Sequence, residues 1–199
     1  MSLDAPFFEQ LFAANPDPWA LRSRWYEQRK RALTLAALTR QRYARVFEPA
    51  CANGELSILL ATRSEHLLCM DASASAVALT RQRLHTQPQV EVVQGHLPVD
   101  WPEGQFDLIV LSEFGYYLDS RDWQQVIDQA QASLGPQGSL LACHFLQPMP
   151  ECPQTGQQVH DQLQTRLQLT RVVQHREADF LLELWSRQPG GMDLEEQCL

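Results

Sequence analysis

The sequence lacks the features of a membrane or exported protein. No apolar run approaches the ~20 residues that a membrane-spanning helix needs, and the mean hydropathy is -0.31. The first ten residues contain Asp4 and Glu9 but no basic stretch followed by an apolar one, the pattern of a secretory signal. Glycine and proline are too few, at 9 and 12 of 199 residues, for a collagen-like or low-complexity chain. We therefore predict a soluble, cytoplasmic protein that binds no membrane.

Patterns typical of metal sites and disulfide frameworks are missing as well. The five cysteines are an odd number and form no CxxC pair. His160 and His175 have no carboxylate or cysteine at the spacing of metal ligands. We predict no metal site. We also expect buried, inert thiols in a reducing compartment at Cys51, Cys69, Cys143, Cys152 and Cys198.

The charge balance argues against non-specific binding to nucleic acid. The formal net charge is -8, although residues 22–45 hold seven arginines and Lys30 against Glu27 alone. We favour a solvated helix face for this basic segment; the alternative is that one or two of its arginines meet a small carboxylate. With 44% hydrophobic residues, 199 residues suffice for one well-filled core and are too few for two ordinary enzyme domains.

Apolar residues at helical spacing predict two helices at the start of the chain. A short one covers Phe7 to Phe12, and a long amphipathic one covers residues 21–43, with Trp25 packed in the core. From residue 46, short apolar runs alternate with longer periodic segments, and some runs are apolar at nearly every position. Such strands are buried on both faces, which predicts a parallel sheet between two layers of helices. The expected strands are Val46–Pro49, Leu67–Asp71, Val90–Val93, Phe106–Ser112 and Leu140–Phe145, and the expected helices are Leu56–Thr62, Ser75–Leu84 and Trp123–Leu134.

The C-terminal part departs from this rhythm. A helix over Gly156–Leu169 precedes two strand-like runs, Arg171–His175 and Phe180–Ser186. Their connection is too short for a parallel crossover, so we predict an antiparallel hairpin. The whole is predicted to be one domain over residues 1–187, with a helical cap over 1–43 and an α/β core over 46–187. Residues 188–199 are expected to form a flexible tail.

The loop after the first strand carries small residues at alternate positions. Glu48, Ala50, Ala52 and Gly54 resemble motif I of class I S-adenosylmethionine-dependent methyltransferases, with alanine at two positions that are more often glycine. Small side chains let a cofactor lie directly on the backbone of the turn. A pyrophosphate needs bare amides at a helix start, and the GxGxxG pattern that provides them is absent. The loop therefore favours a methyltransferase over a nicotinamide-dependent oxidoreductase.

The next two loops supply further candidates for cofactor binding. Asp71 ends the second strand 17 residues after Gly54, close to the ~20-residue spacing at which a carboxylate binds ribose hydroxyls, and Ala72 follows it. The alternative is that Asp71 caps the helix that begins near Ser75. The third strand is followed by Gly95, His96 and Leu97, where related enzymes hold the adenine; many have aspartate at the position of His96. Ser112 ends the fourth strand, where the methyl group would face the acceptor.

Motifs along residues 5–187 resemble the nodulation protein S (NodS) family. They are Phe7-Phe8-Glu9-Gln10-Leu11-Phe12, Asp17-Pro18-Trp19, Trp25-Tyr26-Glu27-Gln28-Arg29-Lys30, Leu111-Ser112-Glu113, Tyr116-Tyr117-Leu118 and His144. The resemblance implies the class I methyltransferase fold, a Rossmann-like doubly wound sheet that is mostly parallel with helices on both faces. It also implies S-adenosyl-L-methionine as cofactor and S-adenosyl-L-homocysteine as product. The founding type N-methylates the free amine of a deacetylated glucosamine at the end of a chito-oligosaccharide.

The resemblance also gives the N-terminal helices a purpose. They would cover the cofactor, with Trp19, Tyr26 and Arg29 facing the site and Arg29 paired with the methionine carboxylate. The alternative for Trp19 is core packing.

Three residues are candidates for catalysis. Glu113 and His144 follow the fourth and fifth strands, where they are placed to make an acceptor amine nucleophilic, and Tyr117, with Tyr116, would wall the methyl group. Alternatively, Glu113 only binds backbone groups and His144 is a satisfied histidine at a strand end. We predict a methyltransferase that N-methylates a primary amine of a small molecule such as an amino sugar or oligosaccharide. The alternatives are an O-methyltransferase acting on a small metabolite and a non-catalytic protein that binds S-adenosylmethionine.

Overall fold

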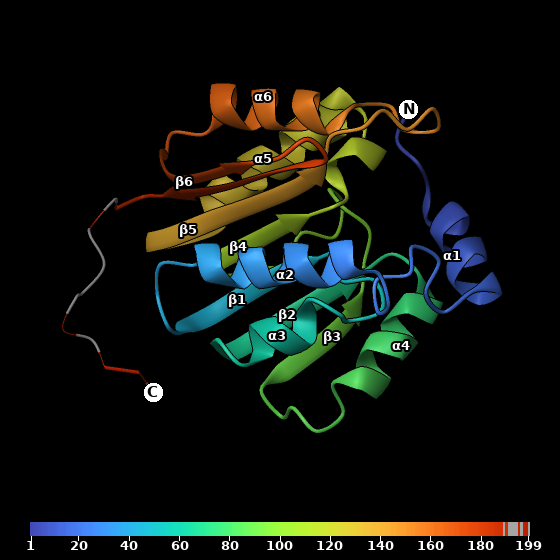
Figure 1. The fold of residues 1–199 in the computed structure, drawn as a ribbon, viewed down its shortest axis with the longest axis horizontal. Coiled ribbons are helices and arrows are strands. Elements are labelled where there is room, and N and C mark those ends of the chain that lie inside the picture. Colours follow the sequence, from blue (N-terminus) through green and yellow to red (C-terminus); the bar gives the residue numbers. More distant parts are fainter. Residues whose placement is uncertain (189, 191–194, 196, 199) are drawn as a thin grey trace.

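A seven-stranded sheet crosses the molecule between two layers of helices (Figure 1). The computed structural model describes residues 1–188, 190, 195 and 197–198, so most of the tail predicted over 188–199 lies outside the described residues. The strands are β1 (Tyr43–Pro49), β2 (Ser64–Asp71), β3 (Val90–Gln94), β4 (Phe106–Ser112), β5 (Leu134–Phe145), β6 (Thr170–Arg176) and β7 (Phe180–Ser186). The α-helices are α1 (Ala5–Ala14), α2 (Trp25–Ala37), α3 (Ser57–Ala61), α4 (Ala74–Arg83), α5 (Ser120–Ser133) and α6 (Gly156–Arg166), and a 3-10 turn, η1, covers Gly115–Tyr117.

The sheet has the order β3-β2-β1-β4-β5-β7-β6. The first five strands pair in parallel, whereas β7 runs antiparallel to both β5 and β6. The predicted doubly wound sheet and the C-terminal hairpin are thus confirmed. The chain winds outward from β1 in one direction and from β4 in the other, so the β1 and β4 carboxyl ends flank the switch in strand order where ligands bind in such sheets.

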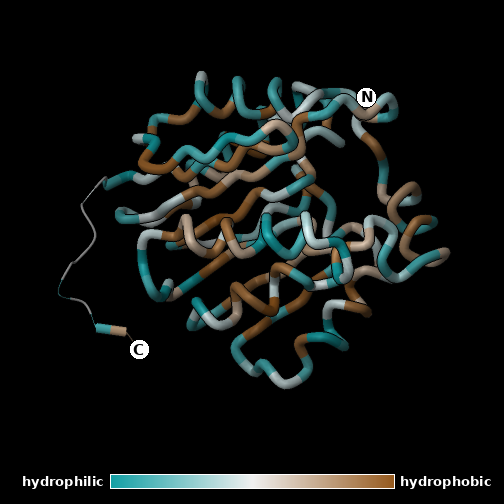
Figure 2. The backbone as a smooth tube through the Cα atoms, viewed as in Figure 1, coloured by the Kyte–Doolittle hydropathy of each residue, from teal (hydrophilic) through white to brown (hydrophobic). Residues whose placement is uncertain are grey.

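Alternate residues of the central strands belong to two separate cores. Ile109 and Leu111 of β4 face the core covered by α5 and α6, whereas Leu108 and Val110 face the core on the side of α2 and α3. All four side chains are fully buried. This arrangement explains why β4 is apolar at nearly every position, and Figure 2 shows the hydrophobic strands inside more polar helices.

The fifth strand begins earlier than expected. Phe106 pairs with Leu134 but Leu108 pairs with Ser139, so residues 135–138 form an irregularity in the β4–β5 register. The segment Gly135-Pro136-Gln137-Gly138, which lies between the predicted helix and the predicted strand, therefore forms a bulge within β5. A bulge accommodates the extra residues because they are left out of the ladder.

The N-terminal cap differs more from expectation. The predicted helix over 21–43 is shortened to α2, and its buried side chains are the polar Glu27, Lys30 and Thr34. The prediction that Trp25 lies in the core was wrong, because Trp25 is 73% exposed. The hydrophobic pattern therefore predicted the wrong inner face for α2. This helix turns the charged side chains of Glu27 and Lys30 toward the interior.

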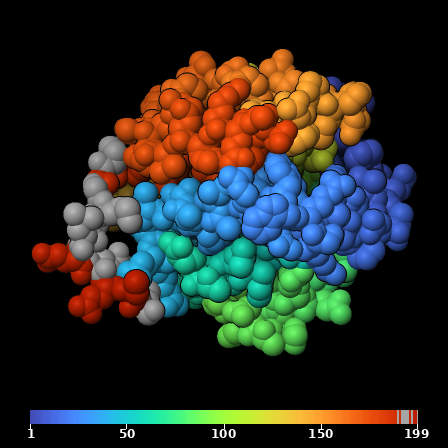
Figure 3. Space-filling model, in the orientation of Figure 1, coloured from blue at the N-terminus to red at the C-terminus, as the bar shows by residue number. Residues whose placement is uncertain are grey.

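The cap lies across one side of the molecule. In Figure 3 the blue N-terminal segment covers the middle of the surface between the orange C-terminal part and the green strands and helices. Leu3 N donates to Tyr117 O, so the extended segment ahead of α1 is joined to η1. Among the described residues, no helix is both long enough and apolar enough to cross a membrane.

Candidate active site

A cavity of about 590 Å³ opens between the cap and the carboxyl ends of the parallel strands. Its wall includes most of the residues that the sequence predicted for the site. They are Trp19, Glu48, Ala50, Asp71, Ala72, Gly95, His96, Leu97, Ser112, Glu113 and Tyr117. Arg29, Gly54 and His144 were predicted for the same site but do not line this cavity. The volume lies in the range of small-molecule and cofactor sites.

The loop after β1 follows a left-handed path. Ala50 has φ 54° and Ala52 has φ 52°, a region that costs an L-residue roughly 1–2 kcal/mol. Both alanines line the cavity, so the loop presents backbone and methyl groups to the space where a ligand would lie. Gly54 has φ 76°, but a Cβ atom there would lie 3.2 Å from Thr80 and Arg83 of α4. Its small size thus permits close packing against α4.

Two buried carboxyls lie beneath this loop. Asp71 accepts hydrogen bonds from Ala52 N and Ser73 N, each at 2.9 Å, and so joins the loops after β1 and β2. Burial raises the pKa of Asp71 to about 6, against the lowering effect of those amides. Burial also raises the pKa of Glu48 to about 7. The cap of α4 is Ser73, whose Oγ accepts from Ala76 N, so the helix does not need Asp71 as its cap.

The loop after β3 lies close to the end of β2. Gly95 N donates to Asp71 O at 3.0 Å, and a Cβ atom on Gly95 would lie 2.9 Å from Met70 Sδ. His96 N donates to Asp100 Oδ2, which holds the loop in a tight turn. A side chain at position 95 would therefore displace the flexible end of the Met70 side chain.

Glu113 is the most constrained charged group of the cavity wall. Its Oε1 accepts from Lys30 Nζ at 2.7 Å, and its Oε2 accepts from Tyr116 OH at 2.6 Å and Phe145 N at 3.0 Å. Lys30 also donates to Glu27 at 3.1 Å. The backbone of Glu113 has φ 60°, so β4 ends in a strained residue, a feature that often marks functional sites.

Lys30 was missed by the sequence analysis. It is the only lysine of the sequence and is 5% exposed. Burial acts to lower the pKa of Lys30, but Glu113 and Glu27 outweigh it and raise the pKa above its usual range. The three-residue spacing of Glu27 and Lys30, which places them on one helix face, is the sequence feature that could have indicated this ion pair.

Aromatic rings surround the carboxylate end of the cavity. Tyr117 makes edge contacts with Tyr116 and Phe8, at centroid distances of 4.7 and 5.1 Å, and lies 6.4 Å from Trp19. Burial raises the pKa of Tyr116 well above its usual range, so this phenol is a proton donor to Glu113 at any physiological pH. The rings surround the cluster of Glu113, Lys30 and Glu27 with apolar surface.

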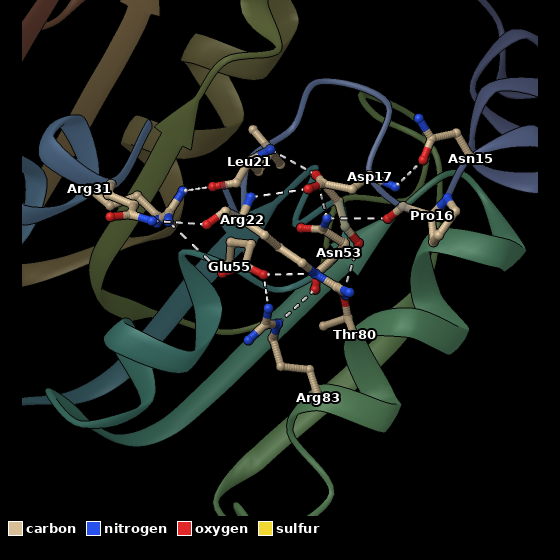
Figure 4. Close-up of polar contacts among 12 residues, drawn as sticks. Asn15, Pro16, Asp17, Leu21, Arg22, Arg31, Asn53, Glu55, Thr80 and Arg83 are labelled. Carbon is tan, nitrogen blue, oxygen red and sulfur yellow. Dashed lines mark hydrogen bonds and ion pairs between the residues drawn. The ribbon is translucent and has the colours of Figure 1, made fainter. Parts of the chain in front are cut away.

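Polar contacts fasten the cap to the loop after β1 (Figure 4). Arg22 of the cap and Arg83 of α4 both pair with Glu55, and Arg31 Nη2 lies 3.9 Å from the same carboxylate. Asp17 accepts from Leu21 N at 2.8 Å and from Asn53 Nδ2 at 3.0 Å. Glu9 of α1 likewise accepts from the Ser73 and Ser75 hydroxyls at the start of α4. Arg31 is therefore mostly buried, whereas Arg22, whose side chain is 45% exposed, pairs with Glu55 at the surface.

Arg29 lies elsewhere than predicted. It forms a bidentate pair with Glu177 at 2.7 Å in the β6–β7 connection, on the outer side of α2. This contact, together with His175, lowers the pKa of Glu177 to about 2. The cations that do line the cavity are Arg24, Lys30 and Arg31.

His144 is fully buried behind the cavity wall. Its Nε2 accepts from Gly115 N at 3.2 Å, and its Nδ1 lies 3.2 Å from His160 Nε2. Burial lowers the pKa of His144 well below its usual range. The ring is thus neutral and engaged at both nitrogens, so it faces the interior instead of the acceptor.

Comparisons with known proteins agree with this architecture. A family model described as a methyltransferase domain matches residues 46–138. Nodulation protein S of Rhizobium tropici is 29% identical over 130 residues, which cover 64% of this chain and 55% of that protein. The chain thus spans little more than half the length of this relative.

Two solved structures extend the comparison. A protein from Pseudomonas syringae assigned as a methyltransferase is 56% identical and superimposes with a TM-score of 0.75. The match covers 82% of this chain and 100% of that chain. The N-methyltransferase NodS of Bradyrhizobium japonicum WM9, in complex with S-adenosyl-L-homocysteine, has a TM-score of 0.80 at 24% identity, covering 92% of this chain and 97% of that one. The fold and the loops around the cavity define a class I methyltransferase. The chain belongs to the S-adenosylmethionine-dependent methyltransferase family.

Proposed function

We propose that the protein transfers a methyl group from S-adenosylmethionine to a primary amine of a small molecule such as an amino sugar or oligosaccharide. The observation that carries this proposal is Glu113. It is a carboxylate in the cavity wall, held at the end of β4 among aromatic rings. A carboxylate in an apolar setting suits an acceptor that offers N–H groups. The relatives named nodulation protein S support the same reaction type.

The residues around the cavity fit the cofactor. Asp71 carries one backbone donor on each oxygen, which leaves acceptor capacity for ribose hydroxyls. Ala50 and Ala52 present a close backbone, and Gly95 adds no side chain to the cavity wall. Arg24 lines the cavity and, among the described residues, its side chain forms no ion pair, so we assign it to the methionine carboxylate in place of Arg29.

When bound, S-adenosylmethionine supplies an electrophilic methyl group on a sulfonium, which the acceptor nitrogen attacks in line. The chain's own residues then orient the acceptor, a contribution that reaches ~7–11 kcal/mol in well-placed reactions. Glu113 has three hydrogen-bond donors on its two oxygens, so it retains capacity to accept from an amine N–H. Tyr116 and Lys30 fix the direction of that contact.

The amine must be neutral when it attacks. Burial in the aromatic end of the cavity disfavours the ammonium form and lowers the pKa of the acceptor. Lys30, Tyr116 and Phe145 N hold the Glu113 carboxylate in place, so we assign it first to orientation and only second to proton removal. The dependence of the reaction on pH separates the two roles, as described in the Discussion.

The test uses two sugars that differ at one group. The purified protein is incubated with S-adenosylmethionine labelled in its methyl group and with either glucosamine or N-acetylglucosamine. We expect transfer to glucosamine, which has a free amine, and none to N-acetylglucosamine. A short deacetylated chito-oligosaccharide extends the comparison to longer acceptors.

Each alternative gives a different outcome. Equal transfer to both sugars would identify a hydroxyl acceptor and replace the proposal by O-methylation. Tight binding of the cofactor with no transfer to any of a panel of amines would identify a non-catalytic binding protein.

A further inference from the structure

A chain of buried polar groups runs from β7 to the turn beneath the cavity. Glu183 Oε2 lies 2.6 Å from His160 Nδ1, His160 Nε2 lies 3.2 Å from His144 Nδ1, and Gly115 N donates to His144 Nε2 at 3.2 Å. These residues belong to β7, α6, β5 and η1, so the chain crosses four elements. The side chains of Glu183, His160 and His144 are all at most 2% exposed.

The backbone amide of Gly115 fixes the direction of every bond in this chain. An amide only donates, so His144 Nε2 is an acceptor and the neutral ring carries its proton on Nδ1. That proton is donated to His160 Nε2, which leaves the His160 proton on Nδ1, facing Glu183. Both rings are therefore held in the Nδ1–H tautomer, and Glu183 is the final acceptor.

Glu183 is anchored from the far side. Its Oε1 accepts from Arg171 Nη1 at 2.7 Å and from Gln174 Nε2 at 2.9 Å, both on the edge strand β6. Burial acts to raise the pKa of Glu183, but these donors and His160 outweigh it and lower the pKa. A buried carboxylate that accepts hydrogen bonds on both oxygens is held in one orientation, which makes Glu183 a fixed end point.

The other end of the chain meets the active site. Gly115 begins the turn that carries Tyr116 and Tyr117, and Tyr116 donates to Glu113. A Cβ atom on Gly115 would lie 3.0 Å from His144 Nε2 and 2.8 Å from Val159, so the turn is pressed against the ring.

We propose that Glu183, His160 and His144 form a relay of fixed tautomers that holds the Gly115–Tyr117 turn. His160 and Glu183 are then positioning residues for methyl transfer, although neither lines the cavity. This inference rests on the proposed function, since it assigns the relay to the placement of Tyr116 and Glu113 against the acceptor. The relay itself is testable without turnover.

The first test reads the tautomers directly. Long-range ¹⁵N–¹H spectra of the full-length protein, labelled with ¹⁵N-histidine, report which ring nitrogen of each histidine carries the proton. We expect Nδ1–H for both His144 and His160. An Nε2–H tautomer in either ring at neutral pH would overturn the relay.

The second test breaks the relay at its middle. His160→Leu removes the acceptor of the His144 proton, whereas His160→Gln keeps an oxygen where Nε2 lies. His175→Leu is the matched control, because His175 pairs with Glu177 outside the relay. We expect the Gly115 amide and Tyr116 ring resonances to shift in His160→Leu and to stay near their wild-type positions in the other two. Unchanged Tyr116 resonances in His160→Leu would refute the link to the active site.

Kinetics with glucosamine then measure the positioning role. We expect His160→Leu to lower kcat about tenfold or more while the Kd for S-adenosylmethionine stays within about twofold, since the loss is one of orientation. His160→Gln should restore most of the rate. If His160→Leu does not fold, Glu183→Met, which removes the acceptor of the His160 proton, gives the same comparison, with Glu183→Gln as the variant that keeps an acceptor oxygen.

The spectra and the kinetics test the relay and the proposed acceptor separately. If wild-type protein does not methylate glucosamine, the proposed acceptor fails while the spectra still decide the relay. Equal kcat losses in His160→Leu and His160→Gln, or a parallel loss of cofactor affinity, would contradict a positioning role.

Discussion

Removal of Lys30 is expected to destabilise the protein strongly. Lys30 is buried and shared by Glu27 at 3.1 Å and Glu113 at 2.7 Å. Lys30→Met keeps the length and apolar stem of the side chain but leaves two carboxylates without a counter-charge. Breaking a buried pair in this way costs about 3–5 kcal/mol. At about 2–4 °C per kcal/mol for a chain of this size, Tm should fall by roughly 6–20 °C.

Urea unfolding at neutral pH measures this loss. Arg166→Met is the control, because the Arg166–Asp128 pair is exposed, at 36% and 57% of the side chains, and such pairs contribute ~0–1 kcal/mol. The double variant Lys30→Met with Glu113→Gln should recover part of the loss, since one stranded charge is removed, with a coupling energy of about 0.5–3 kcal/mol. If Lys30→Met cost no more than Arg166→Met, the buried network would not stabilise the fold as described.

Four further predictions concern the cavity. Asp71→Ala should weaken S-adenosylmethionine binding by about 1.5–3 kcal/mol in calorimetry, because it removes acceptors for the ribose. In the folded protein the pKa of Asp71 is about 6, against an ordinary 3.8, so this carboxyl ionises at a lower pH in the unfolded state. The free energy of unfolding of the wild type therefore falls as the pH rises from about 4 to about 6. Asp71→Asn does not titrate, so its stability relative to wild type should rise by about 3 kcal/mol over that range. Ala52→Gly should stabilise the protein by about 1 kcal/mol by relieving a left-handed alanine at φ 52°. Glu113→Gln should lower methyl transfer to glucosamine with little change in cofactor affinity, and by a constant factor across pH if the carboxylate orients the amine.

Each of these predictions has a contrary outcome. Unchanged cofactor affinity in Asp71→Ala would remove this residue from the site, and a pH-independent stability difference for Asp71→Asn would contradict its raised pKa. Ala132→Gly, in the exposed face of α5, should instead lose about 1 kcal/mol; a similar loss in Ala52→Gly would show that the loop is not strained. Relief of the Glu113→Gln defect at high pH would assign proton removal to the carboxylate.

The main features of the fold follow from patterns that extend over many residues. The run of apolar residues in β4 predicts a strand buried on both faces, because neighbouring positions face different cores. The short link between β6 and β7 predicts a hairpin, since no parallel crossover fits it. The small residues after β1 and the acidic end of β2 lie where parallel strands end, which is why both reach one cavity.

The polar interior of the site depends on contacts between distant segments. Nothing near Arg29 in the sequence indicates Glu177, which lies 148 residues away and determines the direction of its side chain. His144 lies near the end of β5, as expected, but its ring packs in the core against His160 of α6. In the sequence, Lys30 is one of several basic residues of a helical segment. Only the fold brings it to Glu113, which follows β4. Trp25 is apolar and yet exposed, because that network occupies the inner face of α2.

Identifying the methylated atom of the product tests whether the protein transfers a methyl group from S-adenosylmethionine to an amine. The protein is incubated with glucosamine and S-adenosylmethionine carrying a ¹³C-labelled methyl group, and the product is examined by ¹³C–¹H correlation NMR. We expect an N-methyl resonance that correlates with C2 of the sugar. A methyl resonance on a sugar oxygen, or bound cofactor with no labelled product from any amine, would contradict it.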